Sequence, residues 1–177
     1  MYITVYLGAN PGSDPALGEA VRDLGRWIGE AGHTLVYGGS KTGLMGELAA
    51  AVLAAGGPVI GVETRFFVEQ NAQYEGLTQL LVTETMAERK TKMMELGEAF
   101  IAFPGGTGTL EEIAEVMSRV SLGQLDAPCI LYNLHGYYDP LQALLERMIG
   151  AGLSTHERQQ GIRFAADPEE IRRLLHP

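Results

Sequence analysis

The sequence predicts an α/β fold, a three-layer Rossmann-like sandwich with a mostly parallel central sheet. Short runs rich in β-branched residues alternate with longer stretches whose apolar residues recur every three or four positions, which is typical of successive βαβ units. Two connections from a strand into a helix are rich in glycine. Ligands of such folds bind at the carboxyl ends of the strands, so we expect the functional site at that edge of the sheet.

The first half of the chain contains the clearest helix signals. Asp14 is the expected N-cap of a helix that has Pro15 at its first position and that Gly32 ends, with apolar residues at helical spacing between them. The other elements expected here are strands over 3–7, 33–37, 58–62 and 77–83 and a helix over 43–55. Residues 63–76 show no clear period, so we expect a loop or a short helix over the sheet there.

In the second half of the chain, Thr85 and Glu88 have the Thr-x-x-Glu spacing of a capping box, which opens a helix that runs to Gly97. The remaining expected elements are strands over 98–103 and 129–133 and helices over 109–122, 139–151 and 167–175. No repeat, low-complexity segment or linker interrupts this order. Because 177 residues is an ordinary length for one domain, at roughly 100 to 200 residues each, we predict a single domain over 1–177.

The composition excludes several classes of partner. With 22 acidic and 13 basic residues the net charge is -9, which repels nucleic-acid polymers and anionic membranes. The longest uncharged apolar stretch, 48–62, is interrupted by Gly56, Gly57 and Pro58 and is shorter than the roughly 18 residues of a spanning helix, and the N-terminus has no basic region typical of a signal peptide. A single cysteine, Cys129, excludes an internal disulfide and a thiolate-rich zinc site. We therefore predict a cytoplasmic protein with no nucleic-acid polymer and no membrane as partner.

Two glycine-rich segments, 38–46 and 104–112, leave a strand and enter a helix, where backbone N–H groups attract anions. Glu111 stands where a dinucleotide-binding loop has its third glycine, which disfavours NAD. Lys41 and Thr42 precede Gly43, whereas in a P-loop the lysine and the hydroxyl residue follow the second glycine of the motif. The alternative is a tight turn in which glycine only supplies a positive φ. Two loops in one chain favour one crevice, with a phosphate on one rim and the rest of a small nucleotide across it.

Two side chains near these loops are candidates for chemistry, and each has a structural alternative. Glu112 either completes a capping box with Thr109 or faces the sugar of a bound 5'-nucleotide, one helical turn from the phosphate. Arg89 is either a solvated charge or a fork that grips ligand oxygens. Lys90 and Lys92 flank it and are expected in solvent from the pattern alone. The four histidines lie in different elements and no carboxylate cluster accompanies them, so we expect no metal site.

Three segments together resemble the Lonely Guy (LOG) family, which was long labelled "possible lysine decarboxylase". They are Gly38-Gly-Ser-Lys-Thr-Gly-Leu-Met-Gly46, Met86-Ala-Glu-Arg-Lys90 and Pro104-Gly-Gly-Thr-Gly-Thr-Leu-Glu-Glu112. The resemblance runs from Ile3 to Leu153 and includes the segments 99–104 and 136–138, the latter reading Gly-Tyr-Tyr.

The resemblance implies a cytokinin riboside 5'-monophosphate phosphoribohydrolase, which hydrolyses the N-glycosidic bond of an N6-modified AMP and releases the free base, cytokinin or adenine, and ribose 5-phosphate. It places the catalytic residues at Arg89 and Glu112. The substrate-binding positions that it implies are Gly38, Gly39, Met86, Lys90, Gly105, Gly106, Thr107, Gly108, Thr109 and Ser118. It further implies a homodimer with the interface near the active site. Independently, a carboxylate suits the oxocarbenium-like centre that forms at C1' and the water that attacks it, with no cofactor.

Two other functions compete with hydrolysis. A nucleotide- or molybdenum-cofactor-binding carrier needs the glycine loops but not Glu112, and the presence of both Arg89 and Glu112 favours the enzyme. An amino-acid decarboxylase needs a Schiff-base lysine in a pyridoxal phosphate site, and no pattern around Lys41, Lys90 or Lys92 supports one.

The chain departs from the family at three places. Ala9 and Asn10 stand where the family often has two serines, which exchanges a hydroxyl for an amide. Arg65 lies in a segment, 63–66, that more usually contains proline, and Arg119 replaces a frequent tryptophan. The last two changes bear on the base-side pocket and on its choice of N6 substituent.

Overall fold

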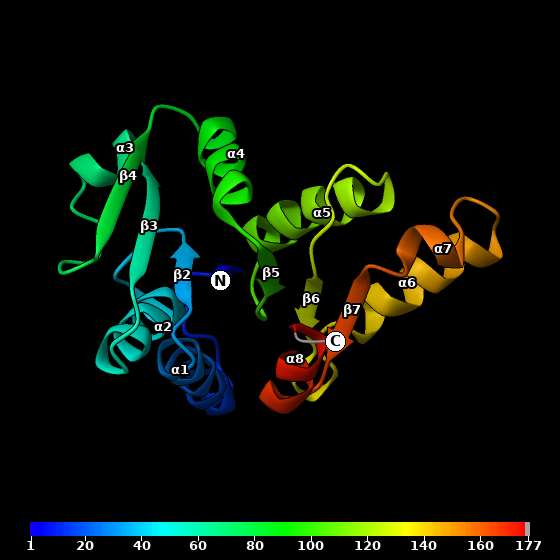
Figure 1. Ribbon diagram of the computed structural model, residues 1–177, viewed down its shortest axis with the longest axis horizontal. Helices are drawn as coiled ribbons and strands as arrows, with labels where there is room; N and C mark the ends of the chain where they lie inside the picture. Colours follow the sequence, from blue (N-terminus) through cyan, green and yellow to red (C-terminus); the bar gives the residue numbers. More distant parts are fainter. Residues whose placement is uncertain (176–177) are drawn as a thin grey trace.

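The computed structural model describes residues 1–175 as one sheet between two layers of helices (Figure 1). The strands are β1 Tyr2–Tyr6, β2 Thr34–Tyr37, β3 Val59–Thr64, β4 Gln79–Thr83, β5 Ala99–Ala102, β6 Cys129–Tyr132 and β7 Ile162–Ala165. The helices are α1 Pro15–Glu30, α2 Gly43–Ala54, α3 Arg65–Glu69, α4 Met86–Leu96, α5 Thr107–Ser121, α6 Asp139–Gly150, α7 His156–Gln159 and α8 Pro168–Leu175, with a 3-10 turn η1 at Leu134–Gly136.

The sheet has the order β4-β3-β2-β1-β5-β6-β7, and every neighbouring pair of strands is parallel. The chain builds outward from β1 to β4 and then returns to the other side of β1 as β5. The carboxyl ends of β1 and β5 therefore form the point where the strand order reverses, which is the usual ligand site of such sheets. The predicted three-layer α/β sandwich is confirmed, with a sheet that is parallel throughout.

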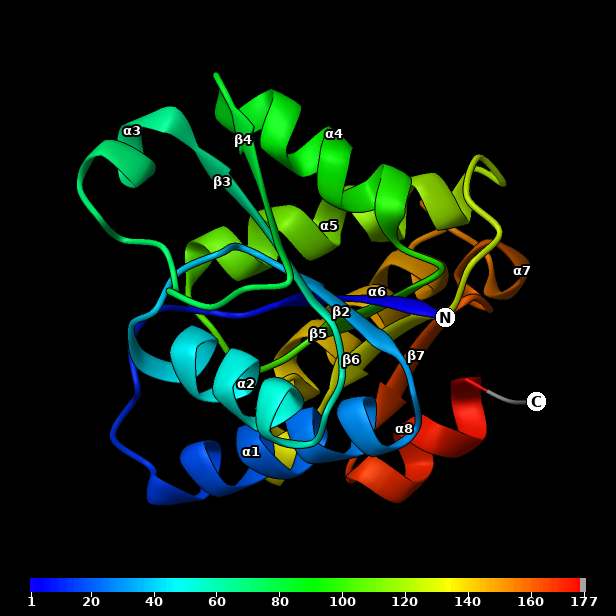
Figure 2. The same ribbon diagram turned by 60° about the vertical axis from the view of Figure 1, so that its left-hand side comes forward.

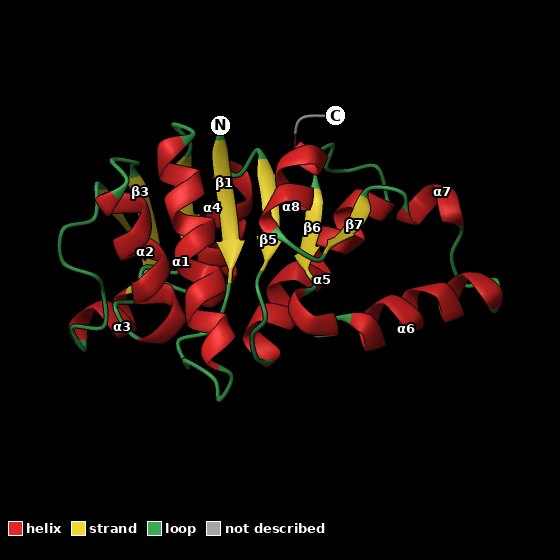
Figure 3. Cartoon of the chain, turned by 90° about the horizontal axis from the view of Figure 1, so that it is seen from below, coloured by secondary structure: helices red, strands yellow, loops and turns green. Residues whose placement is uncertain are grey.

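The two helical layers bury separate cores. Helices α1, α2 and α8 cover one face of the sheet, and α4 and α5 cover the other (Figure 2). Residues of β1 alternate between the two cores, with Ile3 and Val5 on the α1 side and Tyr6 on the α4 side. Both faces of the sheet are thus covered, and the exposed carboxyl edge carries the loops that can bind a ligand (Figure 3).

At α1 and α4, local signals set the helix starts as the sequence predicts. Asp14 accepts a hydrogen bond from the N–H of Ala16 at 2.9 Å and caps α1. Thr85 accepts one from the N–H of Glu88 at 3.1 Å and caps α4, whereas the Glu88 carboxylate binds the N–H of Glu84 rather than that of Thr85.

The structure corrects three assignments. Strand β3 continues to Thr64, so Glu63 is a strand residue and not part of a loop, and the short helix α3 follows it. Helix α5 begins at Thr107, two residues earlier than expected. Strand β7 and helix α7 were not predicted, because four-residue elements of mixed polarity carry too short a period to be recognised. Within residues 1–175, no helix is both long and apolar enough to cross a bilayer.

Candidate active site

The loop between β5 and α5 presents a helix N-terminus at the carboxyl edge of the sheet. Gly106 is the N-cap of α5 in an extended conformation, and Leu110 is the residue whose N–H binds the Gly106 carbonyl, at 3.1 Å. The N–H groups of Thr107, Gly108 and Thr109 precede this bond, and groups at these positions have no partner inside the helix. Together with the positive end of the helix dipole, they favour an anion here.

A buried hydroxyl supports the same interpretation. The side chain of Thr109 is only 3% exposed, and its Oγ1 has no hydrogen-bond partner among residues 1–175. A Cβ added at Gly105 would lie 2.2 Å from this oxygen, so a glycine is required for the loop to pass over it. A buried hydroxyl without a partner is costly, and a phosphate oxygen at the start of α5 would supply an acceptor for it.

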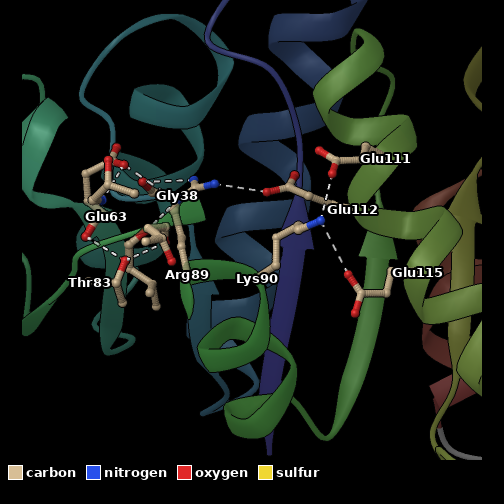
Figure 4. A network of polar contacts seen from close by, with 11 residues as sticks. Gly38, Glu63, Thr83, Arg89, Lys90, Glu111, Glu112 and Glu115 are labelled. Atoms are coloured by element: carbon tan, nitrogen blue, oxygen red, sulfur yellow. Dashed lines mark hydrogen bonds and ion pairs between the residues drawn. The ribbon is translucent and has the colours of Figure 1, made fainter. Parts of the chain in front are cut away.

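Arg89 crosses from α4 to the carboxyl ends of β2 and β3 (Figure 4). The residue is only 6% exposed. Its Nε donates to the Val62 carbonyl at 2.9 Å and its Nη2 to the Gly38 carbonyl at 3.3 Å. Its Nη1 donates to Glu112 Oε1 on α5 at 3.0 Å. The alternative of a solvated surface charge is therefore wrong.

Glu112 uses its carboxylate for Arg89 and not for a helix cap. Because Gly106 is the N-cap, Thr109 is the third residue of α5, and the capping-box alternative for Thr109 and Glu112 does not apply. Glu112 is buried beside the guanidinium. Burial raises the pKa of its carboxyl, and the charge and hydrogen bond of Arg89 oppose this rise.

Glu63 is a second buried carboxylate at this site, and sequence reasoning did not single it out. It lies at the end of β3, 4% exposed, with Oε1 3.5 Å from Arg89 Nε and 2.8 Å from the N–H of Thr64, which donates to it. Burial also raises the pKa of Glu63, against the attraction of Arg89. Its one sequence signal was an acidic residue directly after a run of apolar strand residues, at the edge where parallel sheets bind ligands.

The first glycine loop makes room for this charged cluster. A Cβ at Gly38 would lie 2.2 Å from Arg89 Nη2, and one at Gly39, whose φ is +85, would lie 3.2 Å from the Cβ of Glu63. The missing side chains at Gly38 and Gly39 therefore leave room for the Arg89 guanidinium and for Glu63. Gly39 also has the positive φ expected of a glycine in a tight turn. The structure thus brings Gly38, Gly39, Arg89 and Glu112 together.

The family resemblance also implies substrate-binding positions at Met86, Lys90 and Ser118. Lys90 points to α5, where its Nζ lies 2.7 Å from Glu111 and 3.5 Å from Glu115, rather than into solvent (Figure 4). Met86, the first residue of α4, is 46% exposed. Ser118 is exposed and stands six residues after Glu112, about 9 Å along the helix and on another side of it.

Two of the positions that depart from the family, Arg65 and Arg119, have carboxylate partners. Arg65 forms a two-pronged contact with Glu84, through Nε at 3.0 Å and through Nη2 at 2.5 Å. Arg119 binds Glu115 one turn earlier on α5, at 3.0 Å. Arg65 and Arg119 thus each have a surface carboxylate as partner in this chain.

A cavity of about 480 Å³ adjoins the β5–α5 loop where the strand order reverses. Its lining includes Gly8, Asn10, Leu44, Gly105, Gly106 and Tyr137. Arg89 and Glu112 are not among the residues that line it. Gly105 lines the cavity and also lies next to the Thr109 hydroxyl, so the cavity adjoins the start of α5.

Cys129 and His33 are buried in the core. Cys129 is buried in β6, and burial raises the pKa of its thiol to about 12, which keeps it protonated. His33 is buried with its ring against Trp27, at 5.5 Å between centroids. Within the described residues 1–175, no three His, Cys, Asp or Glu side chains are grouped as a metal site would need.

Comparison with known proteins gives a family. Residues 45–175 match the family model described as "Possible lysine decarboxylase". A protein of Rhodococcoides fascians named cytokinin riboside 5'-monophosphate phosphoribohydrolase is 42% identical over 168 residues, which cover 94% of this chain and 85% of that protein. The rice protein named cytokinin riboside 5'-monophosphate phosphoribohydrolase LOG is 35% identical over 169 residues, 96% of this chain and 70% of the rice protein.

Solved structures share the fold at lower identity. The molybdenum cofactor binding protein of Rippkaea orientalis has a TM-score of 0.70 and 21% identity, covering 98% of this chain and 93% of that one. The Moco carrier protein of Chlamydomonas reinhardtii has the same TM-score and identity, covering 98% and 96%. These likenesses establish the fold.

Proposed function

The chain belongs to the LOG family, whose model carries the description "Possible lysine decarboxylase", and we propose that it hydrolyses the N-glycosidic bond of N6-modified adenosine 5'-monophosphates. The products are the free base, cytokinin or adenine, and ribose 5-phosphate. The observation that carries this proposal is the buried Arg89–Glu112 pair, one helical turn from the open N-terminus of α5. Glu112 follows Thr109 by three residues, about 4.5 Å further along the axis of α5, and in this proposal the phosphate and the sugar of one nucleotide span these two positions.

The helix N-terminus binds the substrate by its phosphate. The N–H groups from Gly106 to Thr109 donate to the phosphate oxygens, and the Thr109 hydroxyl adds a donor that has no partner among residues 1–175. Backbone donors on a fixed helix end lose little freedom on binding, so the sugar is held in one orientation before the reaction.

Glu112 acts on the sugar and the water. Breaking the bond from C1' to the base nitrogen leaves positive charge on C1' and the ring oxygen, and the Glu112 carboxylate stabilises that charge. The same carboxylate takes a proton from the water that attacks C1'. Its raised pKa suits this task, because a base is most effective when its pKa approaches the working pH.

Arg89 holds Glu112 and has donors left for the substrate. A guanidinium carries five N–H groups, and three of them bind Val62, Gly38 and Glu112. The two that remain are available to ligand oxygens. On the basis of the family resemblance, we also propose that the substrate is bound by Gly38, Gly39, Met86, Lys90 and Ser118.

The proposal also covers the oligomeric state and the cellular compartment of the protein. We propose a homodimer in which α4 and α5 approach the partner, since Met86, Leu110 and Leu122 on or beside these helices are exposed. A single domain and a cytoplasmic setting, predicted from length, charge and cysteine content, belong to the same proposal.

Product analysis tests the proposed function. The protein is incubated with AMP and, separately, with N6-isopentenyl AMP, and the free base and ribose 5-phosphate are quantified. We expect equal amounts of base and ribose 5-phosphate from the hydrolysed substrate. Recovery of intact nucleotide in both incubations, with tight nucleotide binding, would instead indicate a carrier of the same fold.

A further inference from the structure

Two consecutive tyrosines in the connection between β6 and α6 donate hydrogen bonds to the loop between β5 and α5. The hydroxyl of Tyr138 donates to the Phe103 carbonyl at 2.9 Å, and the hydroxyl of Tyr137 donates to the Gly105 carbonyl at 2.5 Å. These two carbonyls lie on either side of Pro104. The Gly-Tyr-Tyr segment therefore has contacts to the loop that binds phosphate in the proposed function, although it comes from the connection between β6 and α6.

The backbone before these tyrosines is held in an uncommon conformation. His135 has a φ of 51 and Gly136 a φ of 76, and a non-glycine residue in this region is unfavourable unless its surroundings enforce it. Asn133 supplies part of that support, since its Oδ1 accepts from the N–H of Tyr138 at 2.6 Å and its Nδ2 donates to Asp139 at 2.7 Å. The conformation of this turn thus directs both tyrosine side chains toward the carbonyls of Phe103 and Gly105.

The hydrogen bond from Tyr137 fixes more than one atom. The peptide unit that joins Gly105 to Gly106 is planar and trans, so its C=O and N–H point in opposite directions. Holding the Gly105 oxygen therefore also sets the direction of the Gly106 N–H, at the N-cap of α5. Glycine has no side chain to restrict its dihedrals, and a loop of two glycines needs such an external restraint.

We propose that Tyr137 is a positioning residue for the reaction: by holding the Gly105 carbonyl, it orients the Gly106 N–H toward the 5'-phosphate of the substrate. The inference rests on the proposed function for the identity of the anion. Tyr137 acts through the loop and stands apart from the reacting atoms, so it influences substrate binding and leaves the chemical step to Glu112. Tyr138 is buried and anchors the preceding carbonyl, which makes it the structural half of the pair.

The test compares Tyr137→Phe with Tyr2→Phe as a matched control. Tyr137 is 51% exposed, so removing its hydroxyl leaves the fold intact, which thermal melting checks. Tyr2 is also an exposed tyrosine but lies at the amino end of β1, the opposite edge of the sheet. With Tyr137→Phe we expect the KM for N6-isopentenyl AMP and the Kd for ribose 5-phosphate to rise by about fivefold to tenfold, the value of one hydrogen bond, with kcat nearly unchanged. The control should leave all three constants at the wild-type values.

The outcomes separate this inference from the proposed function. An active wild type whose KM and Kd are unaltered by Tyr137→Phe overturns the positioning role alone, as does a fall in kcat without a change in KM. A wild type that binds ribose 5-phosphate but releases no base overturns the proposed function, and the Kd comparison still decides the role of Tyr137. A wild type that does not bind ribose 5-phosphate overturns the positioning role as stated.

Discussion

Arg89 and Glu112 form a buried ion pair between α4 and α5, with 3.0 Å between Nη1 and Oε1. Buried ion pairs contribute little net stability, because removing two charges from water offsets their attraction. Breaking one partner, however, leaves an uncompensated charge. The position of this pair at the carboxyl edge of a parallel sheet supports the catalytic role that we propose for it.

The pH dependence of turnover should reflect the burial of Glu112. Its pKa is raised by burial and by the charge of Glu111, and the charges of Arg89 and Lys90 oppose this rise. Because the ionised form accepts the proton from water, kcat should fall on acidification at a pH above the ordinary range of a glutamate, about 4 to 5. A kcat profile that stays flat down to pH 4.5 would contradict this assignment.

The same raised pKa predicts how stability changes with pH. A carboxyl that binds its proton more tightly in the folded state stabilises the fold below its unfolded pKa, and this contribution is lost as the pH rises through the folded pKa. Relative to wild type, Glu112→Gln should therefore gain stability as the pH is raised from about 4 toward neutrality. Urea unfolding of both proteins at several pH values measures the difference, and a difference that is constant with pH contradicts the prediction.

Glu63 should tune the ion pair without performing the reaction. Glu63→Gln keeps an oxygen for the N–H of Thr64 but removes a negative charge from the guanidinium that Glu112 also uses. The acid limb of kcat should move to lower pH, because Glu63 and Glu112 share the charge of Arg89 and a neighbouring like charge raises a carboxyl pKa. Glu84→Gln is the control, since Glu84 is an exposed carboxylate that pairs with Arg65. An unchanged acid limb in Glu63→Gln would show that Glu63 has no influence on Glu112.

The substrate should require its 5'-phosphate. A nucleoside leaves the N–H groups at the start of α5 without their ionic acceptor. Charge-assisted hydrogen bonds contribute about 1.5 to 3 kcal/mol each, so the loss of two should lower kcat/KM by at least about a hundredfold. Removing the N6 substituent should matter less, since a single apolar contact is worth about 1 to 3 kcal/mol. Comparable kcat/KM for N6-isopentenyl adenosine and its monophosphate would mean that the glycine loop is only structural.

A homodimer is predicted, and light scattering at working concentration should give about twice the chain mass of 19.1 kDa. Ile113, Val116 and Met117 on α5 pack into the core of this chain and leave no apolar stripe for a partner. The exposed Met86, Leu110 and Leu122 are the apolar candidates for the interface. A monomer mass with full activity would refute the dimer.

The sequence predicted the order of elements well, because long amphipathic helices and buried strands carry strong periods. Capping residues such as Asp14 and Thr85 placed helix starts correctly. At α5 the same reasoning erred, since a Thr-x-x-Glu spacing occurs inside the helix and only the position of Gly106 shows that it is not a cap.

The sequence motifs identified individual residues of the candidate site but not the contacts between them. Arg89 and Glu112 were identified, but their direct contact joins residues 23 apart, and spacing alone does not show it. Glu63 and Tyr137 were missed as site residues for the same reason. Glu63 meets Arg89 only because β3 ends beside α4, and Tyr137 reaches Gly105 across 32 residues.

The kcat of Glu112→Gln tests the central claim most directly. Glutamine preserves the shape and can still accept a hydrogen bond from Arg89, but it neither stabilises positive charge at C1' nor takes a proton from water. We expect N6-isopentenyl AMP to bind nearly as in wild type and kcat to fall by about a thousandfold. A kcat close to wild type, with binding unchanged, would contradict the catalytic role of Glu112 and the mechanism built on it.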